Sequence, residues 1–444
     1  MSTEECQSPS RVRFGVLALV ALAATNAYMT RSLGAANTTI GREMEISDTE
    51  MGTVLGAFNL GYLLCQIPGG LAASLLGVRR TLALSAAAWS ACTIAASFSQ
   101  TAAHMSLART ALGVAQAALV PCIAKVVADW FPVSRRGLTS AVIAAAMQLG
   151  SIAASGLTAM LLEPLGWRTT LQLYAVVGIA WSGMFWWWFR DSPGQHGQVN
   201  EAERACIAAG RSADDTASPT APALLGWPLV VAMVGSLSFW AFCAQAYCRA
   251  YAYELFSTWF APLLEKGYGV DVETAGQLAS LPTTAILVGS LIAGEVVDRI
   301  FQVTQRRYLS RSGSAIVGML LSGFAFLAVI PIQNPQTLVL IVSVGAVCSA
   351  LANPATWATA MDLGGRYTAV LMAVMNMVGS LGAFHCPRQV GALFDHVAAR
   401  GDARWDLVLW LFAGINLAAA VAWLLVLPTD RIRRLGGAAD VGGG

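Results

Sequence analysis

The sequence predicts an all-α polytopic membrane protein with twelve transmembrane helices in two six-helix bundles. The chain is 56% hydrophobic and 12% charged, whereas soluble proteins have about 25% charged residues. Apolar runs of at least 18 residues recur along nearly its whole length, and a helix needs roughly 20 such residues to cross a bilayer. The two halves of the chain also repeat weakly, which is the third indication of paired bundles.

The spans divide the chain into four parts. We expect an N-terminal bundle over residues 1–189, a cytoplasmic connector with an interfacial lead-in over 190–238, a C-terminal bundle over 239–427 and a cytoplasmic tail over 428–444. The predicted spans lie near residues 14–38, 50–72, 80–99, 105–127, 138–160, 168–189, 239–263, 273–296, 313–331, 336–358, 368–393 and 406–427.

Lysine and arginine are distributed unequally between the predicted loops. Cytoplasmic loops carry an excess of these residues, and the pattern places both termini in the cytoplasm. The predicted outer loops hold few cations, namely Arg42, Arg168, Lys266, Arg400 and Arg404.

Several function classes are excluded by what the sequence lacks. The net charge of +2 gives no indication of nucleic-acid binding, and the nine cysteines show neither CxxC nor metal-ligand spacing. No Walker loop, HExxH or GxSxG motif is present, so we expect no enzyme, cofactor or metal. A membrane sensor is the non-transport alternative, but it would need a soluble domain, and the longest soluble stretch is residues 190–222.

Arg31 lies within the first predicted span, in a segment without other charges between Arg13 and Arg42. If the whole segment is helical, Arg31 lies about 16 Å inside the outer boundary. A guanidinium at mid-membrane costs roughly 3 kcal/mol on insertion scales. Binding of an anion would explain an arginine there; the alternative is a helix that ends near Thr30, with Arg31 extending to the headgroups.

Five stretches carry a family resemblance that covers essentially the whole chain. The chain resembles the major facilitator superfamily and, more narrowly, its anion:cation symporter family, whose bacterial members carry hexuronates, galactonate, glucarate and related acids. The stretches are GYLLCQIPGGLAASLLGVRR at 61–80, ARTALGVAQAALVP at 108–121, DWFPVSRRG at 129–137, STWF at 257–260 and DLGGRYTAVLMAVMNMVGS at 362–380.

The resemblance implies a set of substrate-binding residues. Arg31 matches the first-helix arginine that meets the substrate carboxylate, and Arg109 matches the fourth-helix arginine at the cavity. Tyr62, Gln148 and Asn376 match polar cavity positions, Asn376 within the M-N-x-x-G pattern. Without the resemblance, Arg109 could equally be an interfacial anchor.

Two departures concern ion coupling. An acidic residue commonly precedes the first-helix arginine in this family and another lies in the fourth helix, but this sequence has Thr30 and Gln116 there. Proton symport through the usual pair is therefore not expected. Glu254 and His385 are candidate substitutes for proton coupling; the alternative is that each has a structural role.

The loop after the second helix also departs from the family pattern. The acidic residue expected after Gly70 is Ser74, which removes a charge partner for Arg79 and Arg80 at the predicted inner gate. The second half keeps its version, Asp298-Arg299. We therefore assign gating to these two arginines and to the Asp298-Arg299 pair.

Together these observations predict a secondary active transporter of a small organic anion, a sugar acid or another carboxylate, working by alternating access. Trp357 is a candidate for stacking on a sugar, with packing as the alternative. The coupling ion would be a proton or sodium, and we expect a monomer in the lipid bilayer. An exporter or exchanger of another metabolite on the same fold is the alternative, although an exporter would favour acidic rather than basic cavity residues.

Overall fold

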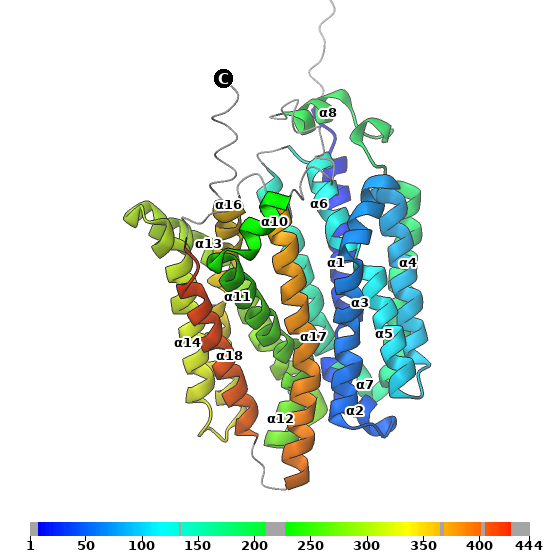
Figure 1. Ribbon diagram of the computed structural model, residues 1–444. Helices are drawn as coiled ribbons and strands as arrows, with labels where there is room; N and C mark the ends of the chain where they lie inside the picture. The colour runs from blue at the N-terminus through cyan, green and yellow to red at the C-terminus, as the bar shows by residue number, and fades with distance from the viewer. Residues whose placement is uncertain (1–7, 133–134, 210–226, 365–367, 401–404, 428–444) are drawn as a thin grey trace, which may run out of the picture. The chain divides into compact units, whose positions relative to one another are not determined.

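The computed structural model describes residues 8–132, 135–209, 227–364, 368–400 and 405–427. Within these ranges the secondary structure is helical (Figure 1). The predicted cytoplasmic tail and residues 210–226 of the predicted connector lie outside the described residues.

The first half of the chain forms long helices joined by short turns, followed by a connector helix. They are α1 (Val12–Arg31), η1 (Gly34–Ala36), α2 (Asn37–Glu43), α3 (Asp48–Leu75), α4 (Val78–Ser97), α5 (Ala102–Gln116), α6 (Leu119–Trp130), α7 (Arg136–Trp188), η3 (Pro193–Gln195) and α8 (Glu201–Ala208).

The second half begins with a short helix inside the predicted lead-in. Its elements are α10 (Trp227–Val234), α11 (Leu237–Glu254), η5 (Leu255–Trp259), α12 (Phe260–Tyr268), α13 (Val272–Thr304), η6 (Leu309–Gly313), α14 (Ser314–Ala328), α15 (Pro335–Ser349), α16 (Ala352–Gly364), α17 (Thr368–Arg400) and α18 (Asp406–Leu424).

Nine helical segments among the described residues are long and apolar enough to cross a membrane, so the number twelve stays a prediction. One segment, α7, has 53 residues and contains both the fifth and the sixth predicted spans. Gly166 lies between these two parts with φ 69°, a conformation that is easy for glycine and costly for residues with a Cβ.

The first predicted span, 14–38, is wrong as a single helix. The α-helix ends at Arg31, because Ser32 is extended with φ −90° and ψ 124°. The chain then continues through η1 and α2, and Leu33, Ala36 and Ile40 are buried. The segment after Arg31 is thus packed against protein, although it does not continue the helix.

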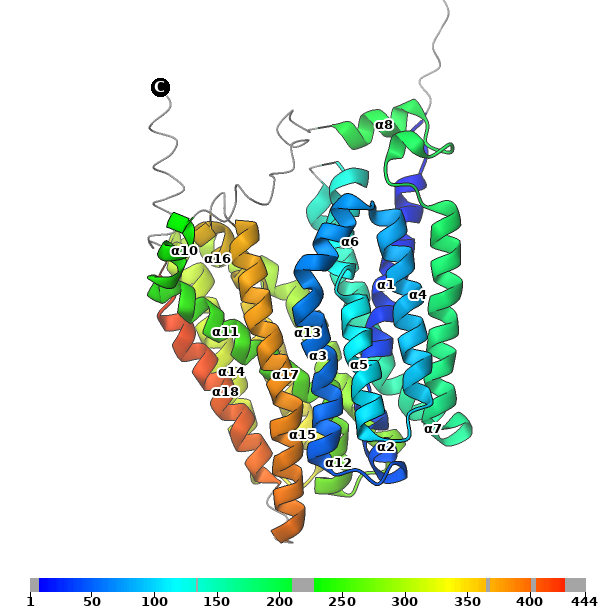
Figure 2. The same cartoon turned by 45° about the vertical axis from the view of Figure 1, so that its right-hand side comes forward.

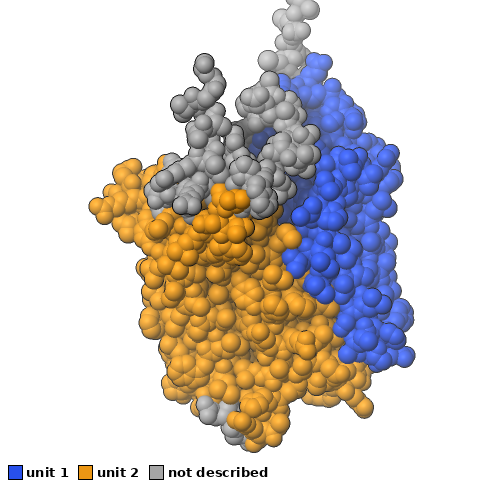
Figure 3. Space-filling view, in the orientation of Figure 1, with its two compact units in different colours: residues 1–32, 60–154, 161–218 blue, residues 33–59, 155–160, 219–444 orange. Residues whose placement is uncertain are grey.

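The contacts divide the chain into two compact units, shown in blue and orange in Figure 3. Unit 1 comprises residues 1–32, 60–154 and 161–218. Unit 2 comprises residues 33–59, 155–160 and 219–444. This division follows spatial contacts, and the sequence-based division at residues 189 and 239 stays a prediction.

Close backbone contacts fix the helices of unit 1 that carry the predicted arginines. A Cβ on Gly61 of α3 would lie 2.1 Å from the carbonyl oxygen of Thr110 on α5, and one on Gly150 of α7 would lie 2.4 Å from that of Thr25 on α1. Thr25 also donates a hydrogen bond to the carbonyl of Ala146 at 3.0 Å. Glycine therefore permits α3 to pack on α5 and α7 to pack on α1.

Unit 2 is built from pairs of neighbouring helices. The pairs α11 with α17, α14 with α18, and α13 with α15 are in extensive contact, and Figure 2 shows α14 beside α18 from a second direction. Its apolar core includes Phe242, Met319, Leu371 and Trp423, all at most 2% exposed. This packing holds the polar residues of α11, α13, α16 and α17 in place.

Candidate functional site

The two predicted arginines of the first half lie together in unit 1. Arg31 is the last residue of α1 and is half-buried, whereas Arg109 of α5 is 3% exposed. Nη1 of Arg109 donates a hydrogen bond to the backbone carbonyl of Arg31 at 2.7 Å. This carbonyl is at a helix C-terminus, where the last carbonyls have no partner within the helix and favour a cation.

Two tyrosines complete this positively charged cluster. The guanidinium carbon of Arg31 lies 4.3 Å from the centroid of the Tyr28 ring, within cation–π range. Tyr62 of α3 lies close enough to Tyr28 and Arg31 to interact with them electrostatically. The structure therefore brings together Arg31, Arg109 and Tyr62, three of the six predicted substrate-binding residues.

The neutral residues at the family's acidic positions hydrogen-bond to each other. Nε2 of Gln116 donates to Oγ1 of Thr30 at 3.0 Å and to the carbonyl of Ala27 at 3.1 Å. Both side chains are buried, at 2% exposure or less. At these two positions the cluster thus holds a satisfied neutral pair in place of two carboxylates.

For the other three predicted substrate-binding residues, the structure gives the helix and the degree of burial. Gln148 is half-buried on α7 of unit 1, two positions from both Ala146 and Gly150, which contact α1. At 100° per residue, Gln148 faces a different side of the helix. In unit 2, Asn376 on α17 is exposed, and the side chain of Trp357 on α16 is 62% exposed. Their roles stay predictions.

Glu254, a predicted coupling residue, is buried at 5% exposure in unit 2. One carboxylate oxygen accepts a hydrogen bond from Ser257 at 2.9 Å, and the other lies 3.5 Å from the amide of Asn59. Glu254 ends α11, and the π-helical turn η5 follows directly. Such turns inside helices are frequent at functional sites.

His385, the second predicted coupling residue, lies on α17 and is exposed. Its Nδ1 is 2.9 Å from the hydroxyl of Tyr247 on α11. Which of the two atoms donates depends on the tautomer of the imidazole. The pair gives the ring a fixed orientation between two helices of unit 2.

Unit 2 contains a hydrogen-bonded polar group that the sequence analysis did not predict. Nη1 of Arg249 on α11 donates to Oδ1 of Asn353 on α16 at 2.7 Å, and Nδ2 of Asn353 donates to Ser290 on α13 at 2.8 Å. Among the described residues, the buried Nε of Arg249 has no hydrogen-bond partner. Arg249 was visible as a charge within the seventh span, but its partner Asn353 is 104 positions away, and Ser290, which accepts from Asn353, is 41 positions away.

Of the predicted gating residues, one has hydrogen-bond partners in the structure and three are exposed. The backbone N–H of Arg79 donates to Asp191 at 2.8 Å, and its Nε donates to the carbonyl of Trp186 at 2.8 Å. Arg80, Asp298 and Arg299 are exposed. Their gating roles stay predictions.

Unit 2 also contains an acidic residue paired with two arginines, which the sequence analysis did not predict. Asp362 of α16 forms ion pairs with Arg311 and, at 3.6 Å, with Arg307. The stretch 362–380 drew attention through its family resemblance, but nothing in it indicated this pair of arginines.

Long apolar helices with cationic and polar side chains inside them are typical of membrane proteins that move solutes or ions. The chain belongs to the Major Facilitator Superfamily, whose sequence model matches residues 17–387. It is therefore a multi-pass membrane transporter and not an enzyme.

Curated relatives match nearly the whole chain at low identity. One, described as a probable sulfoacetate transporter of Cupriavidus necator, is 24% identical, and the match covers 94% of both chains. Another, a probable galactarate/D-glucarate transporter of Bacillus subtilis, is 28% identical over 95% of this chain and 93% of the relative. A probable L-galactonate transporter of Escherichia coli is 25% identical over 94% and 90%.

Solved structures share the fold. A bacterial homologue of the human lysosomal transporter Spinster, in an inward-facing and unoccupied conformation, matches with a TM-score of 0.73 at 15% identity, over 98% of both chains. A D-xylose-proton symporter matches with a TM-score of 0.72 at 14% identity, over 94% of this chain and 99% of the symporter.

Proposed function

We propose that this transporter carries a small organic anion, a sugar acid or another small carboxylate, across the bacterial inner membrane by alternating access. The observation that carries the proposal is the pair of guanidiniums in unit 1, where Arg109 is buried and contacts the residue that bears the second one. A cation is expensive inside a membrane, and an anionic solute would compensate it. The printed names of the relatives, which refer to sugar acids and sulfoacetate, support the same class.

Each predicted substrate-binding residue has a chemical role in this proposal. Arg31 and Arg109 neutralise the carboxylate by charge-assisted hydrogen bonds, and Tyr62 and Gln148 bind hydroxyl groups. Asn376 and Trp357 of unit 2 are candidates for the remaining polar and stacking contacts. Arg249 is a further cation for an anionic group, because the described residues around it supply neutral partners only.

Counterflow in proteoliposomes tests the proposal with D-glucarate, L-galactonate and sulfoacetate as probes. We expect the wild type to exchange at least one of them. Arg31→Ala should lose about 100-fold, because losing the cation that pairs with the solute carboxylate costs about 3 kcal/mol. Arg11→Ala, at the exposed opposite end of the same helix, is the matched control and should exchange normally. Full activity of folded Arg31→Ala would remove Arg31 from the mechanism.

Ion coupling is tested by uptake across imposed pH and sodium gradients. Because Thr30 and Gln116 replace the usual acids, we expect any proton-driven uptake to depend on Glu254 or His385. Replacing the residue that couples, by Glu254→Gln or by His385→Ala, should then abolish the response to a pH gradient. Counterflow, which needs no net proton movement, should persist. A proton requirement that survives loss of both side chains would contradict this assignment, and a response to sodium alone would assign coupling to that ion.

A further inference from the structure

A small cavity lies in unit 1 where the chain leaves α7, and we call it the α7 cavity. Its volume is about 260 Å³, and its lining includes Trp187, Trp188, Arg190, Gln195, His196 and Gln198. This volume is below the roughly 300 Å³ at which pockets for drug-sized ligands begin, so the cavity suits a small polar group. The Lys and Arg distribution predicts that this end of α7 lies on the cytoplasmic side of the membrane.

The lining of the cavity is held in place by aromatic packing and hydrogen bonds. His196 is 5% exposed, and its ring centroid lies 4.8 Å from that of Trp188 and 5.8 Å from that of Trp130. Its Nδ1 accepts a hydrogen bond from the backbone N–H of Gln198 at 3.3 Å. Nε1 of Trp130 on α6 donates to the carbonyl of Arg190 at 3.2 Å. The cavity is therefore formed before any ligand arrives.

Arg190 supplies the positive charge of the α7 cavity. Burial of the imidazole and the nearby Arg190 guanidinium both lower the pKa of His196, so this ring is uncharged at neutral pH. Nη1 of Arg190 donates to the carbonyls of Trp187 and Phe189, each at 2.8 Å. An arginine carries five N–H donors, and those two bonds leave donors of the guanidinium for a ligand.

The acidic residues closest to the cavity are bound to helix N-termini. Asp191 accepts a hydrogen bond at 2.8 Å from a backbone N–H in the first turn of α4. Glu203, which is 0% exposed, accepts from the backbone N–H groups of Val12 at 3.2 Å and Arg13 at 3.1 Å, at the start of α1. Helix N-termini favour such anions. These carboxylates thus stabilise α1 and α4 and are not paired with Arg190.

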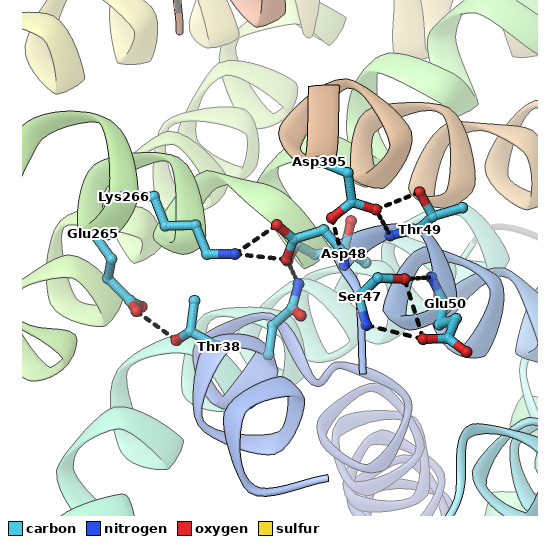
Figure 4. Close-up of polar contacts among 10 residues, drawn as sticks. Thr38, Ser47, Asp48, Thr49, Glu50, Glu265, Lys266 and Asp395 are labelled. Carbon is cyan, nitrogen blue, oxygen red and sulfur yellow. Dashed lines mark hydrogen bonds and ion pairs between the residues drawn. The ribbon is translucent and has the colours of Figure 1, made fainter. Parts of the chain in front are cut away.

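A lysine of unit 2 shows the contrasting case of a paired cation. Nζ of Lys266 lies 2.6 Å from both carboxylate oxygens of Asp48 (Figure 4). Arg190 has no carboxylate at ion-pair distance among the residues that the structure describes. A cation without a carboxylate partner, at the level of the lipid headgroups, attracts anionic groups of the membrane surface.

We propose that the α7 cavity binds the phosphate of an anionic phospholipid from the cytoplasmic leaflet. Arg190 pairs with the phosphate by charge-assisted hydrogen bonds, and the exposed amides of Gln195 and Gln198 donate to oxygens of the headgroup. Trp187 is 74% exposed, and its indole packs on the glycerol and the first methylenes of the acyl chains, as tryptophans do at membrane interfaces.

The exposed indole beside the cation favours a lipid over a soluble phosphate compound. A soluble phosphate has no apolar part for the indole to cover, whereas a phospholipid presents apolar surface directly below its phosphate. Basic pockets on the cytoplasmic side of transmembrane helices recognise anionic headgroups in this way. The site concerns the surroundings of the transporter and does not depend on the identity of the solute.

Native mass spectrometry of the delipidated full-length protein tests the site. Phosphatidylglycerol and phosphatidylcholine with the same acyl chains are titrated separately. We expect the first phosphatidylglycerol to bind about tenfold more tightly, which is the order of a hydrogen bond to a charged group. Arg190→Gln should remove this preference. Gln198→Glu should do the same, because it places a like charge beside the phosphate.

The second variant keeps the test valid if Arg190→Gln loosens the end of α7. The side chain of Gln198 is exposed, and its bond to His196 is made by the backbone N–H, so Gln198→Glu should keep the parent melting temperature. Arg306→Gln is the matched control, because it removes an exposed arginine of unit 2 and so tests for general attraction by charge. It should retain the preference for phosphatidylglycerol.

Glycerol phosphate, which has the phosphate without the acyl chains, distinguishes a soluble ligand from a lipid. At the same concentration as the lipid it should not displace phosphatidylglycerol. The proposal is overturned if Gln198→Glu keeps the preference, if Arg306→Gln loses it as fully as the cavity variants, or if glycerol phosphate displaces the lipid.

Discussion

Replacing Arg109 by glutamine is expected to reduce transport about 100-fold, because loss of a buried hydrogen-bonded charge costs about 3 kcal/mol. The side chain is 3% exposed and its guanidinium donates to the last carbonyl of α1, so it both orders the end of α1 and supplies positive charge beside Arg31. Arg109→Lys keeps the charge but loses the fork of donors, and should retain intermediate activity. Counterflow rates and melting temperatures of the purified variants check both roles.

Arg168→Gln is the control that separates the two roles of Arg109. Arg168 also donates to a carbonyl near the end of a helix, that of Ser99 at 3.2 Å, and its guanidinium lies 4.2 Å from the ring centroid of Trp167. It should lose stability on substitution without losing transport. If Arg109→Gln and Arg168→Gln lower the melting temperature equally and both transport normally, Arg109 is structural only.

Replacing Arg249 by methionine is expected to abolish transport while raising the melting temperature. Its guanidinium contacts Asn353, and its buried Nε has no partner among the described residues. An arginine inside a membrane span costs roughly 3 kcal/mol, so an apolar side chain of similar length should stabilise the fold. Since about 1 kcal/mol shifts the melting temperature of a large domain by about 2 °C, thermal unfolding in detergent can measure the gain.

A fall in melting temperature, instead of the expected rise, would identify Arg249 as a structural arginine. If Arg249→Met lowers the melting temperature and leaves counterflow intact, the contact with Asn353 holds α11 to α16 and has no part in anion binding. Asn353→Ala is the companion variant, because it removes the partner of Arg249 but keeps the charge. It should lose less transport than Arg249→Met.

The fold class could be predicted from the sequence because membrane-spanning helices require long apolar segments with few charges. Long apolar runs and the quoted family stretches suffice for a helical transporter, and the family model confirms it. The end of α1 could not be predicted. The segment 32–40 carries no charge and could have continued the helix. The helix nevertheless stops before Gly34, which packs on the backbone of Ser257 in a contact that only the folded chain provides.

The family resemblance names single positions of the candidate site, and some of them are close in the structure. Arg31, Arg109 and Tyr62 lie near one another in unit 1, and Thr30 and Gln116, identified as departures, hydrogen-bond to each other. That they bind substrate stays a prediction. Partners that lie far apart in the sequence were not predictable. Asn353 and Ser290 look like ordinary polar residues in apolar helices until the packing of α11, α13 and α16 places them beside Arg249.

Helix α3 is shared between the two units, since its residues up to Asn59 belong to one and those from Leu60 onward to the other. Gly52 and Gly56 fit it to α17, whereas Gly61 and Gly69 fit it to α5 and to the turn before α6. Contacts between main-chain atoms tolerate little displacement, because no flexible side chain lies between the helices to adjust its conformation. Sliding of α17 along α3 by even a small distance should therefore be costly over the whole length of their contact.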